Sequence, residues 1–268
     1  MPKTKAESSV QSTLFVGSVA KAFAVLEVFR EGVGSASLTE VAELTGLGRS
    51  AAQRFTHTLT MLGYLVQDDQ TRRYQPGLKL LRLGGAYTSS MRLTEVALPH
   101  MVTLGEETAQ SVHLSQLDGS DIVYLDRLPR NEVRSLGATT GSARPAVATA
   151  PGRCLLAHIP ATRLDEVIKM GCARFTPRTT IEPSELRVEI SRARSQGWAI
   201  AVEQIRVGEA SAAAPIFGPA DRAVAAMSMP VSLDDFGPGE IAERLVPALL
   251  GAADAVTIQL GGVKPPLS

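Results

Sequence analysis

Apolar and polar positions alternate most regularly in residues 37–75. Ser37 and Glu40 have the spacing of a helix capping box and precede the apolar residues of a short helix. Gly46 stands where a helix C-cap belongs, so a second helix is expected from about residue 49 to residue 62. Its apolar residues fall on one face: Ala51, Ala52, Phe55, Leu59 and Leu62. Two short helices joined by a tight glycine turn predict a helix-turn-helix.

The opposite face of the second helix is polar, and no carboxylate occurs between Arg49 and Gln67. Residues 64–66 and 72–75 are expected to pair as a hairpin around a turn at 68–71, with Arg72 and Arg73 on its return strand. An αα-hairpin inside a larger helical domain is the alternative, but the acid-free face and the hairpin together favour a winged helix-turn-helix. The polar face and its flanks carry Arg49, Ser50, Gln53, Arg54, His57 and Thr60.

Similar patterns organise the rest of the chain. A helix capped by Ser18 is expected to end near Gly32, and helical pieces at 78–83 and 86–91 are separated by Gly84 and Gly85. Further helices are expected at 94–109, 149–158, 162–170, 184–196 and 238–260. Strands are expected at 111–117, 121–128, 133–139, 198–203, 209–217 and 222–231. Helices interleaved with antiparallel hairpins predict an α+β domain with one sheet.

The predicted elements divide the chain into four parts. We expect a disordered tail at 1–16, a winged helix-turn-helix at 17–77, a linker helix at 78–93 and a second domain at 94–262. The length of 268 residues is compatible with two modest domains, each large enough to bury a core.

Charged residues are distributed unevenly between the two parts of the chain. The chain has 27 Lys and Arg against 27 Asp and Glu, which by itself argues against a nucleic-acid partner. Residues 1–85 contain ten basic and seven acidic residues, a net +3, whereas 86–268 contain seventeen and twenty, a net −3. The basic excess therefore coincides with the predicted helix-turn-helix, as a DNA-contacting module requires, although its field is weak.

The sequence also indicates a cellular compartment. Its two cysteines do not make a disulfide framework, and no apolar run reaches the roughly 18 residues that a membrane span needs. The N-terminal residues are polar and lack the apolar core of a signal peptide. A cytoplasmic protein without a membrane partner is expected.

Catalytic and metal-binding motifs are missing from the second domain. The sequence contains no G-x-S-x-G, P-loop, H-E-x-x-H or C-x-x-C, and its four histidines are scattered. His113 is more simply explained by packing than as a catalytic base, and Cys154 as a small core residue. We therefore expect no enzyme activity, no metal and no cofactor. Strands rich in Ala, Val and Gly suit a sheet folded over a small apolar pocket, with Ser211 and Ser228 facing inward.

A loop at 141–145 brings one cation to this predicted pocket. Arg144 could present its guanidinium at a strand end, or it could be solvated on the loop; composition alone leaves both open.

The chain resembles the IclR family of bacterial transcriptional regulators over roughly residues 17–260. The first domain carries SVAKAFAVLEVF, LTEVAELTGLGRSAAQRFTHTLTMLGYL and RRYQPGLKLLRLG; the second carries GSARPAVATAPGRCLLA, GW-x4-E and GEASAAAPIFGPADRAVAAMSM. The run RF-x-x-TL-x-x-LGY is also similar to members that control aromatic-acid catabolism. The resemblance implies a winged helix, a linker helix and a GAF-like effector-binding domain. It also implies homodimers or homotetramers that bind double-stranded operator DNA under small-molecule control.

The resemblance also implies an effector site. Carried over to this sequence, that site consists of Val133, Leu136, Arg144, Ala150, Pro151, Ser211, Ser228 and Pro230. The chain departs from some members at Arg144, Ser211 and Pro230, which leaves the effector open. Arg144 favours a small organic acid, because a guanidinium grips a carboxylate through paired hydrogen bonds.

In the DNA-bound state, Ser50, Gln53 and Arg54 are expected to reach base edges in the major groove. Arg49, His57, Arg72 and Arg73 are expected to contact phosphate or sugar. The alternative is an enzyme that acts on the same small acid and carries an accessory DNA-binding domain.

Overall fold

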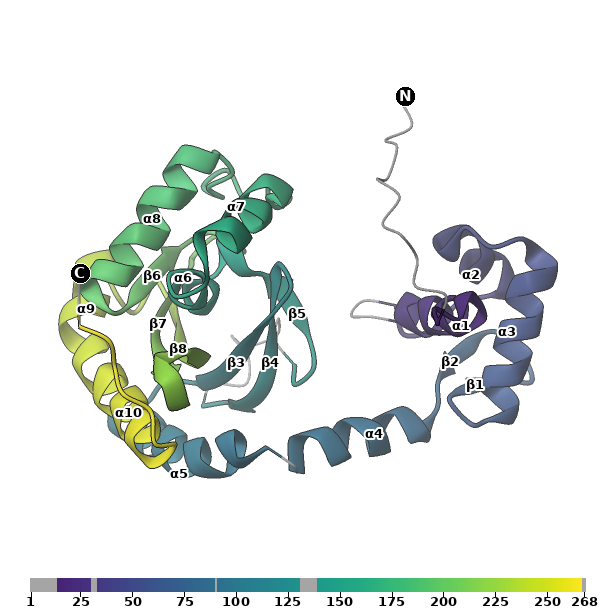
Figure 1. Cartoon of the computed structure of the whole chain (residues 1–268), viewed down its shortest axis with the longest axis horizontal. Coiled ribbons are helices and arrows are strands. Elements are labelled where there is room, and N and C mark those ends of the chain that lie inside the picture. The colour runs from purple at the N-terminus through teal and green to yellow at the C-terminus, as the bar shows by residue number, and fades with distance from the viewer. Residues whose placement is uncertain (1–13, 30–32, 90, 131–138, 267–268) are drawn as a thin grey trace. The chain divides into compact units, whose positions relative to one another are not determined.

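The computed structural model describes residues 14–29, 33–89, 91–130 and 139–266. The chain divides into two compact units, residues 1–86 and 87–268 (Figure 1). Most of the tail predicted at 1–16 lies outside the described residues. No helix among the described residues has both the length and the apolar composition to cross a membrane.

The first unit packs three helices against a small hairpin. Its helices are α1 (Gly17–Leu26), α2 (Leu38–Thr45) and α3 (Arg49–Met61), with a short 3-10 turn at Glu27–Phe29. Strands β1 (Leu65–Gln67) and β2 (Tyr74–Pro76) pair antiparallel, and Ala36 bridges to Tyr74 on the other side. The core consists of Val25, Val28, Ala36, Val41, Ala52, Leu59, Leu65 and Tyr74. This arrangement is the predicted winged helix-turn-helix.

Both ends of α2 form as the sequence predicts. The Ser37 backbone N–H donates to Glu40 Oε2 at 2.6 Å, and the Glu40 N–H donates to Ser37 Oγ at 3.3 Å, which completes the capping box. Gly46 ends α2 with a φ of 68°, a left-handed conformation that disfavours other residues. The capping box thus fixes the start of α2, and Gly46 lets the chain turn toward α3.

The second unit is built on a six-stranded antiparallel sheet in the order β5-β4-β3-β8-β7-β6. In chain order its strands are β3 (Val112–Asp118), β4 (Asp121–Leu128), β5 (Ala143–Pro145), β6 (Ala199–Val202), β7 (Glu209–Phe217) and β8 (Ala223–Ser232). Helices α5 (Arg92–Thr108), α9 (Pro238–Arg244) and α10 (Val246–Gln259) pack on one face. Helices α6 (Ala150–Leu156), α7 (Ala161–Met170) and α8 (Pro183–Gln196) cover the other. The α+β prediction with one sheet is confirmed for the described residues.

Three predicted elements differ from the structure. Helix α4 (Leu78–Ser89) runs without a break through Gly84 and Gly85, because glycine weakens a helix by about 1 kcal/mol without blocking its hydrogen bonds. The predicted final helix is instead two, α9 and α10, because Pro247 lacks the N–H that would continue the ladder. Residues 143–145 form an edge strand rather than a loop, because they pair with β4. The strand predicted at 133–139 lies outside the described residues, apart from residue 139.

Candidate functional site

Helix α3 buries one face and exposes the polar face that the sequence indicates. Ala52, Thr56 and Leu59 are buried, and the Thr56 hydroxyl donates to the Ala52 carbonyl at 2.9 Å. That internal hydrogen bond lets a polar residue take part in the core. Leu62, predicted for the buried stripe, is instead 49 % exposed because it lies beyond the last helical turn.

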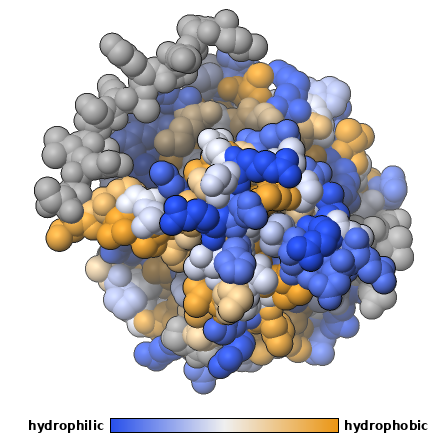
Figure 2. All heavy atoms as spheres, turned by 90° about the vertical axis from the view of Figure 1, so that its right-hand side faces the viewer, coloured by the Kyte–Doolittle hydropathy of each residue, from blue (hydrophilic) through white to orange (hydrophobic). Residues whose placement is uncertain are grey.

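The predicted DNA-contacting residues of α3 are all exposed: Arg49, Ser50, Gln53, Arg54 and His57. Thr58 and Met61 of the same helix are exposed as well. Figure 2 turns the side of the chain that carries α3 to the viewer and shows strongly hydrophilic residues among hydrophobic patches. A polar, acid-free helix face of this kind can approach phosphates and base edges without charge repulsion.

The two arginines of the wing have different environments. Arg72 is exposed at the tip of the hairpin, where its φ is 57° and its N–H donates to the Asp68 carbonyl at 2.9 Å. Arg73 is half-buried: its Nη2 lies 2.8 Å from Glu40 Oε2, and its guanidinium donates twice to Ser35 at 3.0 Å. Arg73 thus ties the wing to the start of α2, whereas Arg72 is exposed at the tip of the hairpin.

Glu40 takes part both in the capping box of α2 and in the network around Arg73. Hydrogen bonds from Ser37, assisted by the charge of Arg73, hold the pKa of Glu40 below its ordinary value, so the carboxylate stays ionised. The capping box and the wing are therefore joined through one side chain.

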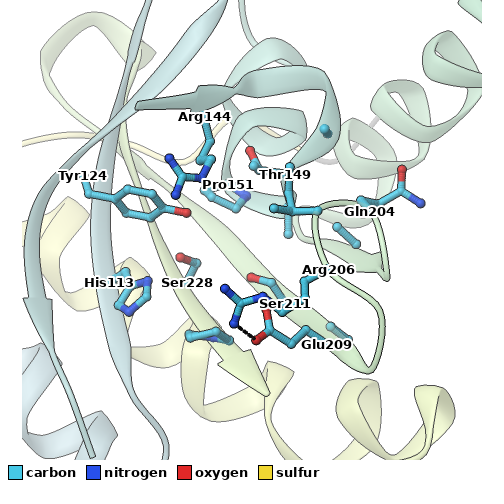
Figure 3. Close-up of a pocket in the computed structure, with 16 residues that line it drawn as sticks. His113, Tyr124, Arg144, Thr149, Pro151, Gln204, Arg206, Glu209, Ser211 and Ser228 are labelled. Carbon is cyan, nitrogen blue, oxygen red and sulfur yellow. Dashed lines mark hydrogen bonds and ion pairs between the residues drawn. The ribbon is translucent and has the colours of Figure 1, made fainter. Parts of the chain in front are cut away.

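In the second unit, a cavity of about 140 Å³ lies between the sheet and the start of α6 (Figure 3). Every described member of the predicted effector set lines it: Arg144, Ala150, Pro151, Ser211, Ser228 and Pro230. Val133 and Leu136 lie outside the described residues. Residues that are up to 86 positions apart in the sequence therefore line one cavity.

The strand register explains this convergence. Ser211 pairs with Ala201 on one side and with Pro230 on the other, while Ser228 pairs with His113. Paired residues of an antiparallel sheet point to the same face, and alternate residues of one strand do as well. Ser211, Ser228 and Pro230 therefore face the cavity, whereas Met227 and Met229 enter the core beneath the sheet.

Helix α6 contributes the opposite wall. Thr149 caps it by accepting a hydrogen bond from the Gly152 N–H at 3.1 Å. Gly152 permits this close packing, because a Cβ there would lie 2.1 Å from the Ala146 carbonyl oxygen. The turn at Ala146–Ala148 and the first residues of α6 are thereby pressed together beside the cavity.

The rim of the cavity is held by a polar network around Gln204. Its Oε1 accepts from the buried guanidinium of Arg153 at 2.9 Å and from the Thr180 N–H at 2.9 Å. Its Nε2 donates to the carbonyls of Arg178 and Val202 at 2.8 and 3.1 Å. This network fixes the chain that continues into the rim residues Ile205 and Arg206.

The charged residues on the cavity lining are two arginines and one glutamate, a net charge of +1. Arg206 and Glu209 form an ion pair of 2.9 Å at the mouth. Figure 3 shows the Arg144 side chain directed into the cavity, and its Nη1 also donates to the Ala143 carbonyl at 2.8 Å. The lining as a whole suits a monoanion better than a dianion.

His113 lies at the cavity, a position that the sequence pattern explained only by packing. Its side chain is buried, and its ring meets the Tyr124 ring edge-on with the centroids 5.4 Å apart. Burial, together with the charge of Arg127, lowers the pKa of His113 to about 3, so the ring is neutral. Its Nε2 has no hydrogen-bond partner among the described residues.

Five further polar residues line the cavity but were not predicted from the sequence: Tyr124, Thr149, Gln204, Arg206 and Glu209. Tyr124 could have been found from the strand alternation once the β3–β4 register was known. Gln204 and Arg206 lie in an irregular segment with no periodic signal.

Cys154 is not suited to act as a catalytic nucleophile. Burial raises the pKa of Cys154 far above its ordinary value, and its Sγ lies 3.3 Å from the Ala213 carbonyl oxygen, so it remains a protonated core thiol. Across the described ranges, no three His, Cys, Asp or Glu side chains gather as a metal site would require. The arrangement is therefore one that can bind a small molecule.

Comparisons with known proteins match both units. Residues 18–69 match the model of the IclR helix-turn-helix domain, and residues 85–258 match that of the bacterial transcriptional regulator IclR C-terminal region. The Pca regulon regulatory protein of Pseudomonas putida is 31 % identical over 250 residues, covering 92 % of this chain and 85 % of that protein.

Two other similar proteins carry a ligand or pathway in their names. The p-hydroxybenzoate hydroxylase transcriptional activator of Acinetobacter baylyi is 26 % identical over 246 residues, with 90 % of each chain covered. The crystal structure of an IclR homolog from Microbacterium hydrocarbonoxydans, complexed with 4-hydroxybenzoate, is 25 % identical with a TM-score of 0.77. That alignment covers 91 % of this chain and 99 % of the other.

Proposed function

Because the chain belongs to the IclR family of bacterial transcriptional regulators, we propose that it controls a catabolic operon in response to a small organic acid. Its relatives are transcriptional regulators, and the alternative of an enzyme with an accessory DNA-binding domain is therefore set aside. The observation that carries the proposal is the exposed, acid-free face of α3 within a winged helix.

In the proposed complex with operator DNA, α3 enters the major groove. Ser50, Gln53 and Arg54 read base edges, and Arg49, His57 and Arg72 contact phosphate or sugar. Arg73 was expected to join the second group. Its ion pair with Glu40 and its hydrogen bonds to Ser35 support a different main role, which is to hold the wing in place.

The proposed effector site is the cavity of the second unit. Arg144 binds the carboxylate, Ser211 and Ser228 hydrogen-bond to polar atoms, and Ala150, Pro151 and Pro230 pack on the carbon skeleton. Val133 and Leu136 complete this set in the family-based expectation. An apolar cavity of about 150 Å³ accommodates benzene in another protein, so a single ring or a short aliphatic chain fits the available space.

The similar proteins support an aromatic acid as the effector. One relative is named for the activation of p-hydroxybenzoate hydroxylase, and a solved homolog holds 4-hydroxybenzoate. The cavity described here, with one net positive charge and mostly small apolar walls, is compatible with such a monocarboxylate.

The regulator is proposed to act as a homodimer or homotetramer. Leu14, Phe15, Val16 and Val19 form an exposed apolar strip at the start of the first unit. An effector that binds one quaternary arrangement more tightly than another would shift the spacing of paired winged helices on DNA.

A DNA-selection experiment tests the proposal. The full-length protein is used to enrich fragments from random DNA, and binding to the enriched site is measured for the wild type, Gln53→Ala and Arg54→Ala. Each substitution should weaken binding by about 1–3 kcal/mol and relax preference at one base pair. Unchanged affinity in both variants would refute the placement of α3 in the groove.

The effector part is tested by a thermal-shift screen against small aliphatic and aromatic acids. A true ligand at one hundred times its dissociation constant stabilises the protein by about 2.7 kcal/mol. Product analysis of the same mixtures should find each acid unchanged; conversion of an acid would restore the enzyme alternative.

A further inference from the structure

The imidazole of His113 is the buried polar group on the cavity lining whose hydrogen bonding is incomplete among the described residues. His113 is 4 % exposed, and its Nε2 has no partner among those residues. A buried polar atom without a partner costs roughly 1–3 kcal/mol, so such an atom beside a binding cavity is well placed to be satisfied by a ligand.

The surroundings of His113 restrict what that ligand group can be. Tyr124 meets the ring edge-on, Ser228 is its partner in β8, and Arg127 is its partner in β4. The pKa of about 3 keeps the imidazole neutral at physiological pH. A neutral imidazole donates from one nitrogen and accepts at the other, which matches a hydroxyl group better than a second carboxylate.

Figure 3 shows Tyr124 between His113 and Arg144 on the wall of the cavity. Arg144 on β5 pairs with Ile122 of β4. His113 on β3 pairs with Arg127 of β4, which is five residues further along that strand. Because β4 has a bulge in this stretch, the separation is that of the four residues from His113 to Leu117 on β3, about 13 Å, of which the long arginine side chain spans a part. A ligand whose carboxylate lies at Arg144 can therefore extend past Tyr124 and reach His113 with its other end.

We propose that His113 is the selectivity residue of this cavity and hydrogen-bonds to a hydroxyl at the far end of a hydroxylated aromatic acid. This inference rests on the proposed effector site, because it needs the carboxylate at Arg144. It adds a residue that distinguishes a hydroxylated acid from the same acid without the hydroxyl.

Calorimetry with matched ligands tests the inference. Benzoate, 3-hydroxybenzoate and 4-hydroxybenzoate are titrated into the full-length wild type and into His113→Phe, which keeps an aromatic ring against Tyr124 but removes both nitrogens. In the wild type, at least one hydroxybenzoate should bind about tenfold more tightly than benzoate, as expected for one hydrogen bond. In His113→Phe this ratio should fall to about one while benzoate affinity is retained.

Two further variants make the test specific. His113→Gln keeps a donor and an acceptor, so it should preserve part of the affinity ratio of hydroxybenzoate to benzoate. It replaces His113→Phe in the test if that variant does not fold. His158→Phe is the matched control, because His158 also packs edge-on against an aromatic ring, Phe217, but does not line this cavity. It should leave the ratio unchanged.

The possible failures are distinguishable. Equal affinity of the wild type for benzoate and both hydroxybenzoates would overturn the role of His113 while leaving the effector class intact. The role of His113 would also be overturned if both His113 variants kept the wild-type affinity ratio of hydroxybenzoate to benzoate. If none of these acids binds the wild type, the inference fails together with the proposed aromatic effector.

Discussion

The buried guanidinium of Arg153 donates a 2.9 Å hydrogen bond to Oε1 of Gln204, and so connects helix α6 to the rim of the cavity. The same guanidinium donates to the Val147 carbonyl at 3.0 Å and lies 3.5 Å from Glu189. One charged side chain in the core thus holds two walls of the cavity together.

Replacement of Arg153 should therefore destabilise the second unit and loosen the cavity. Arg153→Met keeps the volume but leaves the buried Val147 carbonyl without its donor, while Glu189 keeps its ion pair with Arg192, at a cost of about 1–3 kcal/mol in free energy of unfolding. Urea denaturation measures this effect. The matched control is Arg163→Ala, which removes an exposed ion pair with Glu166 and should change stability by less than about 1 kcal/mol. Equal effects of the two would contradict the role given to Arg153.

The two wing arginines should give opposite phenotypes. Arg72→Ala should leave thermal stability unchanged and reduce the slope of log affinity against log salt by about one unit, because one phosphate contact is lost. Arg73→Ala should instead lower the melting temperature of the winged helix, because Glu40 and Ser35 lose their partner. Operator titrations at several salt concentrations, paired with thermal melts, separate the two. A melting temperature unaffected by Arg73→Ala would argue that its network is dispensable.

Arg144→Ala should weaken binding of the best acid from the screen by about 2–5 kcal/mol, the range for removing one partner of a buried charge pair. Ser211→Ala should cost about 1 kcal/mol, as for a neutral hydrogen bond. DNA binding without effector should be unchanged in both variants, because both residues belong to the second unit. Wild-type affinity of Arg144→Ala, measured by calorimetry, would place the carboxylate elsewhere.

The exposed strip at the start of the first unit should mediate self-association. Phe15→Asp combined with Val19→Asp is expected to shift the protein toward monomers in light scattering, because charges oppose an apolar contact. Val188→Asp on α8 is the matched control, since Val188 and Phe15 are 55 % and 54 % exposed. A wild type that is monomeric at micromolar concentration would remove this prediction.

Stability should fall in mild acid, partly because of His113. The pKa of His113 is lowered from 6.5 to about 3, so between these values the unfolded chain binds a proton that the folded protein does not. The free energy of unfolding therefore rises with pH across this window, and His113 accounts for a loss of about 2 kcal/mol on going from pH 7 to pH 5. Urea denaturation at both pH values should show a smaller loss for His113→Phe than for the wild type. Identical losses would mean that His113 becomes protonated in the folded state.

The winged helix could be predicted from sequence because its determinants are local. The Ser37–Glu40 capping box, the left-handed Gly46 and the apolar period of α3 each act within one or two turns. Strand patterns also predicted a single sheet, and family motifs predicted Arg144, Ser211 and Ser228 as members of one site.

The tertiary structure decided which of these side chains meet and what each one does. Strand register placed His113 opposite Ser228, and with it placed a buried imidazole on the cavity. It also gave the adjacent Arg72 and Arg73 different partners, because one stands at the tip of the wing and the other beside Glu40. Periodicity reports only which face of an element is buried. The neighbour that a side chain finds there depends on contacts between residues far apart in the sequence, which no local pattern encodes.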